Sequence, residues 1–109
     1  MKWGKVKKNI YLESEGVKMY SLVYKNYLQD CNEDAILLPD EFSRALVGVA
    51  HQFNKSLAIY DSAKIKTILM ENQDISEDEA TEWFEYNIKG SYVGENTPLF
   101  LDHIHDILL

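Results

Sequence analysis

Apolar residues recur with helical spacing in the second half of this chain, directly after a clear helix start. Ser76 is followed three residues later by Glu79, a capping box that satisfies two free N–H groups at a helix N-terminus. The pattern predicts a helix that begins at about Glu77 and stops at Lys89 and Gly90, where a cation and a glycine favour termination. Its apolar stripe is Ala80, Trp83, Phe84 and Ile88, and its acidic face is Asp78, Glu82 and Glu85.

Two more amphipathic helices are predicted in the first half of the chain. From Val17 onward a tyrosine-rich stripe recurs with helical spacing, and we expect it to pack in the core or in a dimer interface. A second helix is expected after Pro39, with Asp40 as its N-cap and Gly48 permitting a close approach by another element. The first stripe is Tyr20, Val23, Tyr24, Tyr27 and Leu28, and the second is Phe42, Leu46, Val49, Ala50 and Phe53.

Short apolar runs predict strands between the helices. Residues 57–60 are expected to form a strand, after which Asp61 or Ser62 caps a further helix. Residues 99–101 read as another short strand, and residues 5–12 match a weak strand of period two. The remaining features are the inner helical stripe Ile65, Ile68 and Leu69, the apolar run 35–38, and a final helical turn or tail over 102–109.

These elements predict an α+β fold, a helix-rich single domain in which about four helices pack on one side of a small sheet of short strands. We expect residues 19–109 to form the domain and residues 1–18 to form a basic N-terminal arm or extension. The chain has 109 residues, of which 46% are hydrophobic and 12% aromatic, so one core is expected. A core of this size is only modestly stabilising, and we expect a homo-oligomer, a dimer or higher.

The formal net charge of −7 is unevenly distributed, with +4 over residues 1–25 and −11 over residues 26–109. Nucleic acids bind to positive surfaces, so the main body is not expected to contact them. The N-terminal arm is the one candidate for such a contact, and a solvated terminus is the alternative. The cations of this arm are Lys2, Lys5, Lys7 and Lys8.

Cysteine content and hydropathy suggest where the protein works. The lone Cys31 cannot form an intramolecular disulfide, and its acidic surroundings disfavour the reactive thiolate. No stretch of the sequence is apolar over the length of a membrane span. We therefore expect a cytoplasmic protein without a membrane contact.

Two segments are candidates for binding. The acidic face of the helix after Ser76, with nearby tyrosines, could hold a partner protein, and the alternative is a solvated helix face. The segment after Val93 could line a small-molecule pocket or could form a tight turn before the last strand. The first set is Asp78, Glu82, Glu85, Tyr86 and Tyr92, and the second is Gly94, Glu95, Asn96 and Thr97.

Residues with catalytic potential have simpler interpretations. His103 and His105 would point apart on a helix, so a surface tail is favoured over a chelating pair. His51 lies beside a predicted apolar stripe, which suggests a partly buried residue with satisfied hydrogen bonds. Asp61 and Glu71 can be explained by capping or by solvation. We expect no metal ion, no cofactor and no enzymatic activity.

Residues 36–101 resemble a widespread family of small, uncharacterised proteins from tailed bacteriophages and prophages. The most specific part of the resemblance is the phrase Tyr92-Val93-Gly94-Glu95, followed by Thr97-Pro98 and Phe100. Other matching pieces are Ile36-Leu37-Leu38, Phe42, Ala45-Leu46-Val47-Gly48-Val49, Tyr60-Asp61, Ile68-Leu69-Met70-Glu71, Glu79-Ala80 and Trp83-Phe84-Glu85-Tyr86-Asn87. The resemblance implies a viral accessory protein in the host cytoplasm and provides no catalytic residues.

Our main functional hypothesis is a non-enzymatic, anti-CRISPR-like inhibitor that binds a host protein in counter-defence. One alternative is a homo-oligomeric sponge that sequesters a nucleotide immune signal. Another is a nucleic-acid-linked regulator that uses the basic arm.

Overall fold

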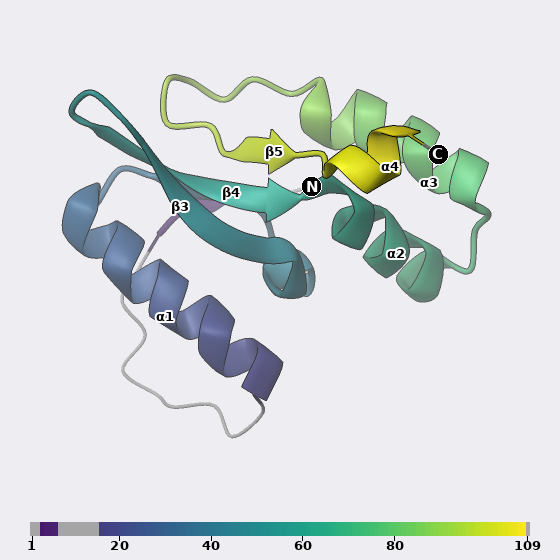
Figure 1. Ribbon diagram of the computed structural model, residues 1–109, viewed down its shortest axis with the longest axis horizontal. Coiled ribbons are helices and arrows are strands. Elements are labelled where there is room, and N and C mark those ends of the chain that lie inside the picture. The colour runs from purple at the N-terminus through teal and green to yellow at the C-terminus, as the bar shows by residue number, and fades with distance from the viewer. Residues whose placement is uncertain (1–2, 7–15, 109) are drawn as a thin grey trace.

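The computed structural model describes residues 3–6 and 16–108 and confirms the helix-rich α+β class (Figure 1). A three-stranded sheet has the order β3–β4–β5, with β4 antiparallel to β3 and parallel to β5. A second, two-stranded sheet pairs β1 with β2. The strands are β1 (Gly4–Lys5), β2 (Ile36–Leu37), β3 (Leu46–Gln52), β4 (Lys55–Asp61) and β5 (Leu99–Leu101). The helices are α1 (Gly16–Cys31), the 3-10 helix η1 (Asp40–Ala45), α2 (Ser62–Gln73), α3 (Glu77–Phe84), the π-helical turn η2 (Glu85–Lys89) and α4 (Ile104–Leu108).

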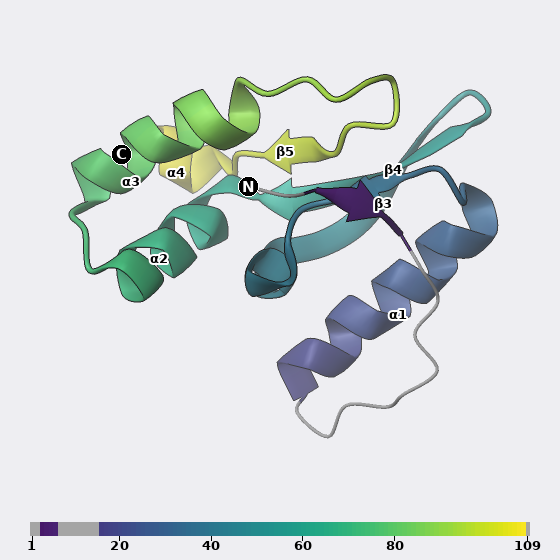
Figure 2. The ribbon, with the colours of Figure 1, turned by 180° about the vertical axis from the view of Figure 1, so that it is seen from behind.

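The core lies on one face of the three-stranded sheet. Helix α1 and the small β1–β2 sheet are on this side, as the view from behind shows (Figure 2). Helices α2 and α3 form the connection between the parallel strands β4 and β5 and pack against each other. The largest fully buried side chains are Tyr60, Phe42, Phe84, Leu28, Ile65, Ile68, Leu69 and Ile88.

The two predicted helix N-termini that have side-chain caps are confirmed. Ser76 accepts a hydrogen bond from the Glu79 backbone N–H at 3.2 Å, and the Glu79 carboxylate accepts one from the Ser76 N–H at 3.3 Å. Asp61 caps α2 by accepting from the Lys64 N–H at 3.2 Å. The predicted strands at 57–60 and 99–101 are present, and the inner stripe of α2 is buried. Local hydrogen bonds between a capping side chain and the backbone therefore identified the starts of α2 and α3 correctly.

The predicted helix after Pro39 is wrong. The chain makes only the short η1 helix and then runs through β3, and Pro39, not Asp40, occupies the N-cap position. Phe53 lies at the tip of the β3–β4 hairpin with a positive φ of 55° and is 99% exposed. Gly48 does not mediate a close approach, because no atom lies within 4 Å of the position of an added Cβ. Helical spacing and strand alternation are hard to separate in a short apolar segment, and tertiary pairing with β4 decides for the strand.

The helix after Val17 is confirmed as α1, but only part of the predicted stripe packs in the core. Leu28 is buried and Tyr24 packs against the core, whereas Tyr20, Val23 and Tyr27 are exposed. Leu22, which is outside the predicted stripe, is buried as well. The helix is rotated toward the side that carries Lys25, whose ammonium donates to the Ser43 hydroxyl at 2.9 Å. A polar contact to η1 thus accompanies the packing of α1, and apolar periodicity alone does not reveal it.

The N-terminal segment is partly integrated into the domain. Val6 is buried in the core, its N–H donates to the Ala35 carbonyl at 2.8 Å, and Trp3 packs against the core from outside. The predicted N-terminal arm over residues 1–18 therefore does not include residues 3–6, which pack with the domain. The weak strand expected over 5–12 is represented by β1 at Gly4–Lys5, and residues 7–12 lie outside the described residues.

Helix α3 continues into a π-helical turn that keeps its last apolar residue buried. The Gly90 N–H donates to the Glu85 carbonyl at 2.9 Å, and the wider turn advances the chain through less rotation per residue than an α-helix. Ile88 therefore stays in line with Ala80 and Phe84, all of which are buried. A Cβ at Gly90 would lie 2.6 Å from the Glu85 carbonyl oxygen, so the π turn requires glycine at this position.

Gly90→Ala should destabilise the fold by about 1–3 kcal/mol, because the backbone must move to admit the methyl group. Urea unfolding followed by circular dichroism measures this change in free energy. Gly48→Ala is the matched control, since its Cβ meets no atom within 4 Å and Ala restricts the unfolded chain more than Gly. An equal loss of stability in both variants would contradict the steric role of Gly90.

The buried Tyr60 makes stability sensitive to alkaline pH. Its hydroxyl accepts a hydrogen bond from the Leu38 N–H at 3.1 Å, and burial raises the pKa of its phenol well above the ordinary value. The neutral phenol is therefore favoured in the folded state. Its contribution is fully present below the unfolded-state pKa of about 10 and is lost above that pH at about 1.4 kcal/mol per pH unit.

Tyr60→Phe should lower the free energy of unfolding by about 1 kcal/mol at neutral pH, because the Leu38 N–H loses its acceptor. Above pH 10 the same variant should lose stability less steeply than the parent chain. Urea titrations at a series of pH values test both effects, with the exposed Tyr86→Phe as the control. Parallel pH profiles for Tyr60→Phe and the parent chain would refute this assignment.

Candidate functional site: an acidic, aromatic groove on α3

An open groove of about 520 Å³ lies along the exposed face of α3 and the start of η2. Its apolar wall contains Trp83 and Ile75, which are partly buried and pack against the core. Tyr86 stands at the groove and is 78% exposed. The complete lining is Gln73, Ile75, Glu79, Glu82, Trp83, Tyr86 and Asn87.

The helix geometry explains why these side chains share one face. Glu79, Glu82, Trp83 and Tyr86 follow the spacing i, i+3, i+4 and i+7. Asp74, with a left-handed φ of 51°, ends α2 and turns the chain so that Ile75 reaches the same groove. The groove thus depends on the turn between the two helices as well as on α3 itself.

Hydrogen bonds hold both ends of the groove in place. The Glu79 carboxylate is fixed by the capping box and by the Ser76 hydroxyl, which donates to it at 3.1 Å. At the other end, the Asn87 amide donates to the Trp83 carbonyl at 3.2 Å. The first contacts fix the Glu79 carboxylate, and the second holds the Asn87 side chain against the helix backbone, before any partner binds.

The groove is electronegative. Residues 77–89 contain five acidic side chains and one basic one, Lys89, which pairs with Glu85 at 3.7 Å. A tryptophan and a tyrosine beside carboxylates attract guanidinium and ammonium groups through ring faces and through charge. The arrangement can therefore hold an arginine or lysine side chain of a partner.

The predicted binding set is only partly brought together. Glu82 and Tyr86 line the groove, whereas Asp78 and Glu85 lie on α3 and η2 outside its lining. Tyr92 is exposed in the segment after η2 and is likewise outside the lining. Sequence reasoning assigned Trp83 to the buried stripe and omitted Gln73, Ile75, Glu79 and Asn87. Their spacing on α3 could have identified Glu79 and Trp83, but the residues before α3 depend on the turn.

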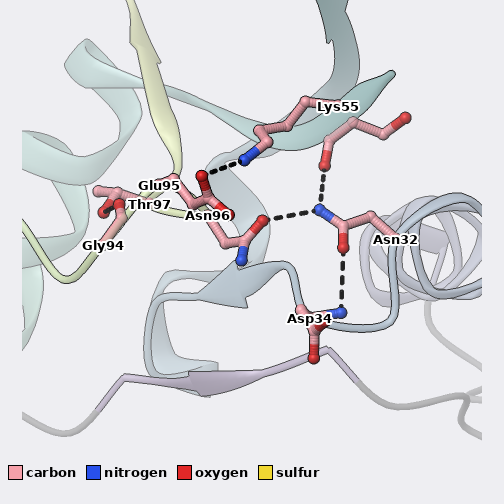
Figure 3. Close-up of polar contacts among 8 residues, drawn as sticks. Asn32, Asp34, Lys55, Gly94, Glu95, Asn96 and Thr97 are labelled. Atoms are coloured by element: carbon pink, nitrogen blue, oxygen red, sulfur yellow. Dashed lines mark hydrogen bonds and ion pairs between the residues drawn. The ribbon is translucent and has the colours of Figure 1, made fainter.

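The second predicted segment, 94–97, forms a tight turn whose polar groups contact other parts of the protein (Figure 3). Gly94 has a φ of 109°, and its carbonyl accepts a hydrogen bond from the Thr97 hydroxyl. The Asn96 side chain accepts from the Asn32 amide at 3.0 Å, and Glu95 pairs with Lys55 at 2.9 Å. This geometry supports the turn interpretation.

Asn32 connects three segments of the chain. Its amide nitrogen donates to the Ser56 carbonyl at 2.9 Å as well as to Asn96, and its side-chain oxygen accepts from the Asp34 N–H at 3.1 Å. The contacts fasten the end of α1 to β4 and to the turn before β5 (Figure 3). The polar loop after α1 is therefore a structural junction.

The histidines have protein partners. His103 is within 3.0 Å of the buried Asp61 carboxylate, and its ring stacks on that of His105 with centroids 5.6 Å apart. The two rings do not point apart, because His103 precedes α4 and only His105 is helical. His51 is exposed on β3, not partly buried on a helix, and contacts the Tyr27 hydroxyl and the Ser56 hydroxyl.

Other candidate residues have structural contacts as well. Glu71 pairs with Arg44 at 2.9 Å. Lys5 pairs with Asp34 at 3.0 Å, and this contact raises the pKa of the Lys5 ammonium. Cys31 is exposed and interacts with Tyr27, an interaction that raises the pKa of the Tyr27 phenol. Lys2, Lys7 and Lys8 of the predicted arm lie outside the described residues.

The part of the chain that the structure describes contains neither a metal-binding cluster nor a helix that could span a membrane. Among residues 3–6 and 16–108, no group of three or more His, Cys, Asp or Glu side chains is placed to hold a metal ion. Within the same ranges, no helix combines the length and the apolar character needed to cross a bilayer.

No protein-family model matches the chain, and neither the search of curated proteins nor that of solved structures gives a match. The resemblance to bacteriophage proteins therefore stays a prediction.

Asn32→Ala should lower the free energy of unfolding by about 1–3 kcal/mol, because it leaves the Ser56 carbonyl and the Asn96 side chain without their donor. Chemical denaturation measures the loss. Asn54→Ala, at the exposed hairpin tip, should change stability by less than about 0.5 kcal/mol. A neutral Asn32→Ala would show that the junction does not stabilise the fold.

Proposed function

We propose that this chain is a non-enzymatic binding protein that captures a basic segment of a partner protein in the α3 groove. The observation that carries the proposal is the combination of Trp83, Tyr86 and Glu82 in one open groove. Arginine and lysine side chains gain from such a site through cation–π attraction and through charge. In the bacteriophage setting that the resemblance implies, the partner is a host protein and the effect is inhibition in counter-defence, in the host cytoplasm.

Preorganisation supports the proposal. Trp83 is held by core contacts and Glu79 by the capping box, so ordering these side chains on binding costs little entropy. Tyr86 has only two rotatable side-chain bonds and offers a large contact area. The groove therefore has the features of an interface in which a few aromatic anchors contribute most of the affinity.

The two alternative hypotheses receive less support from the geometry. A nucleotide sponge would need polar groups at 94–97 that point toward a ligand, but Asn96 and Thr97 are engaged within the protein. A nucleic-acid regulator would use the N-terminal cations, and the described one, Lys5, is paired with Asp34. A binding experiment with a cyclic nucleotide tests the first of these hypotheses, and a binding experiment with DNA tests the second.

Tyr86→Ala and Glu82→Lys should each weaken the binding of an arginine-rich peptide. Loss of one cation–π or ionic contact of about 0.5–2 kcal/mol corresponds to a rise in Kd of roughly 2-fold to 30-fold. Isothermal titration calorimetry with this peptide and with a serine-substituted peptide of equal length measures the effect. Binding should weaken as salt is added, because the attraction is electrostatic.

Two variants outside the groove serve as controls. Tyr92→Ala removes an equally exposed tyrosine, and Glu33→Lys makes the same charge reversal on the loop after α1. Neither should change peptide affinity by more than about 2-fold. If Glu33→Lys weakens binding as much as Glu82→Lys does, the net charge and not the groove attracts the peptide. That result would sink the proposal.

A further inference from the structure

The three-stranded sheet has an outward face that is apolar. Strand pairing places Gly48 and Ala50 of β3 opposite Ile59 and Leu57 of β4, and Leu99 of β5 beside Ile59. The alternate residues, such as Ala58 and Tyr60, face the core. A sheet with one face in water normally alternates between apolar inward and polar outward residues. This sheet lacks that alternation, because its inward and its outward residues are both apolar over most of its length.

The outward residues remain accessible in the single chain. Leu99 and Leu101 are 45% and 40% exposed, and Leu57, Ile59 and Ala50 are partly exposed. Figure 1 looks onto this face, and no helix covers β3 and β4 from the viewer's side. Strands with continuous apolar residues are typical of sheets that are buried on both faces. The strand sequences of this protein have that pattern, but its fold covers only one face of the sheet.

Helix α4 extends the apolar surface on the same side. It lies in front of α3 in Figure 1 and behind α3 in Figure 2, and His103 contacts Asp61 at the end of β4. Its apolar side chains are all exposed. They are Ile104, Ile107 and Leu108.

We propose that this outward face, defined by Gly48, Ala50, Leu57, Ile59, Leu99 and Leu101 and extended by α4, is the surface through which two copies of the chain associate. The second copy supplies the layer that the sheet lacks, because two sheets pack face to face at about 10 Å.

Shape favours a second copy as the occupant. The small residues Gly48 and Ala50 make a shallow strip on β3, and no atom lies within 4 Å of a Cβ built on Gly48. Beside this strip the larger side chains of Leu57 and Ile59 form a ridge on β4. A twofold axis can place the ridge of each copy in the strip of the other, which is the self-complementarity of an isologous interface.

Charge and area also favour this occupant. The six sheet residues are uncharged in a chain of net charge −7, and Asp61, which shares their face, is buried and lies 3.0 Å from His103, so identical copies can meet over the sheet without bringing exposed carboxylates of the strands together. Standard strand spacing makes the sheet roughly 24 Å long and roughly 10 Å wide over β3 and β4, with the width of a third strand only beside the three residues of β5. With the five-residue α4 the flat area is roughly 400 Å² per partner, below the roughly 800 Å² of a standard interface, so a weak and reversible dimer is expected.

Analytical ultracentrifugation of the full chain at micromolar to submillimolar concentration tests the proposal. A monomer–dimer equilibrium is expected, and salt should strengthen it by screening the repulsion between acidic copies. The double variant Leu99→Lys/Leu101→Lys should raise the dimer Kd more than about tenfold, because it buries unpaired charge. Gly48→Arg should do the same, and its Cβ meets no atom within 4 Å in the single chain.

The control is Tyr20→Lys/Val23→Lys on the exposed stripe of α1, which should leave the dimer intact. Circular dichroism and thermal unfolding confirm that each variant folds. A chain that stays monomeric at all concentrations, or a dimer that only the α1 variant dissociates, overturns the proposal. The sheet variants should retain peptide binding in the α3 groove, so this test and that of the proposed function can fail independently.

Discussion

The alternation of side chains along β4 is the constraint on which the rest of the structure depends. This strand is paired on both sides, and its period of two sends Tyr60 into the core and Asp61 to the opposite face. Tyr60 fixes the chain at Leu38 through a buried hydrogen bond, while Asp61 caps α2 and holds His103. A shift of one residue would exchange these two roles, so the register of β4 fixes both the core and the start of the helical layer.

The position of the groove follows from the crossover that begins at Asp61. Phe84 meets Phe100 edge-to-face with centroids 5.5 Å apart, which fastens α3 to β5. With Phe84 inward, Tyr86 points toward the opposite side of the helix, and Trp83 lies at the edge between the two sides, partly buried against the core. The π turn then keeps Ile88 buried, and Gly90 permits it. The exposed groove is thus a consequence of how the buried face of the same helix is anchored.

Sequence reasoning succeeded where short-range chemistry decides the structure. The capping box at Ser76 and the cap at Asp61 marked two helix starts correctly, because their hydrogen bonds lie within four residues. It failed for 40–53, where Leu46, Val49 and Ala50 fit helical spacing although the β-branched Val47 and Val49 and the helix-breaking Gly48 suit a strand. It found α1 and two residues that face the core, Tyr24 and Leu28, but it missed the buried Leu22 and the contact between Lys25 and Ser43. In the groove, Gln73 and Ile75 escaped prediction because their place depends on the turn at Asp74, whereas spacing on α3 could have identified Glu79 and Trp83.

The two proposed surfaces differ in charge, and this difference lets them operate together. Carboxylates are concentrated on α3, whereas the outward sheet face is mostly apolar and its one carboxylate, Asp61, is buried beside His103, so a basic partner and a second copy are drawn to different places. A twofold dimer would carry two α3 grooves. A partner with two basic segments would then bind the second groove at a high effective concentration, and its affinity could exceed that of one groove by 10² or more if the spacing fits. A weak groove and a weak dimer interface can therefore produce tight capture, which would suit a small inhibitor whose single site is shallow.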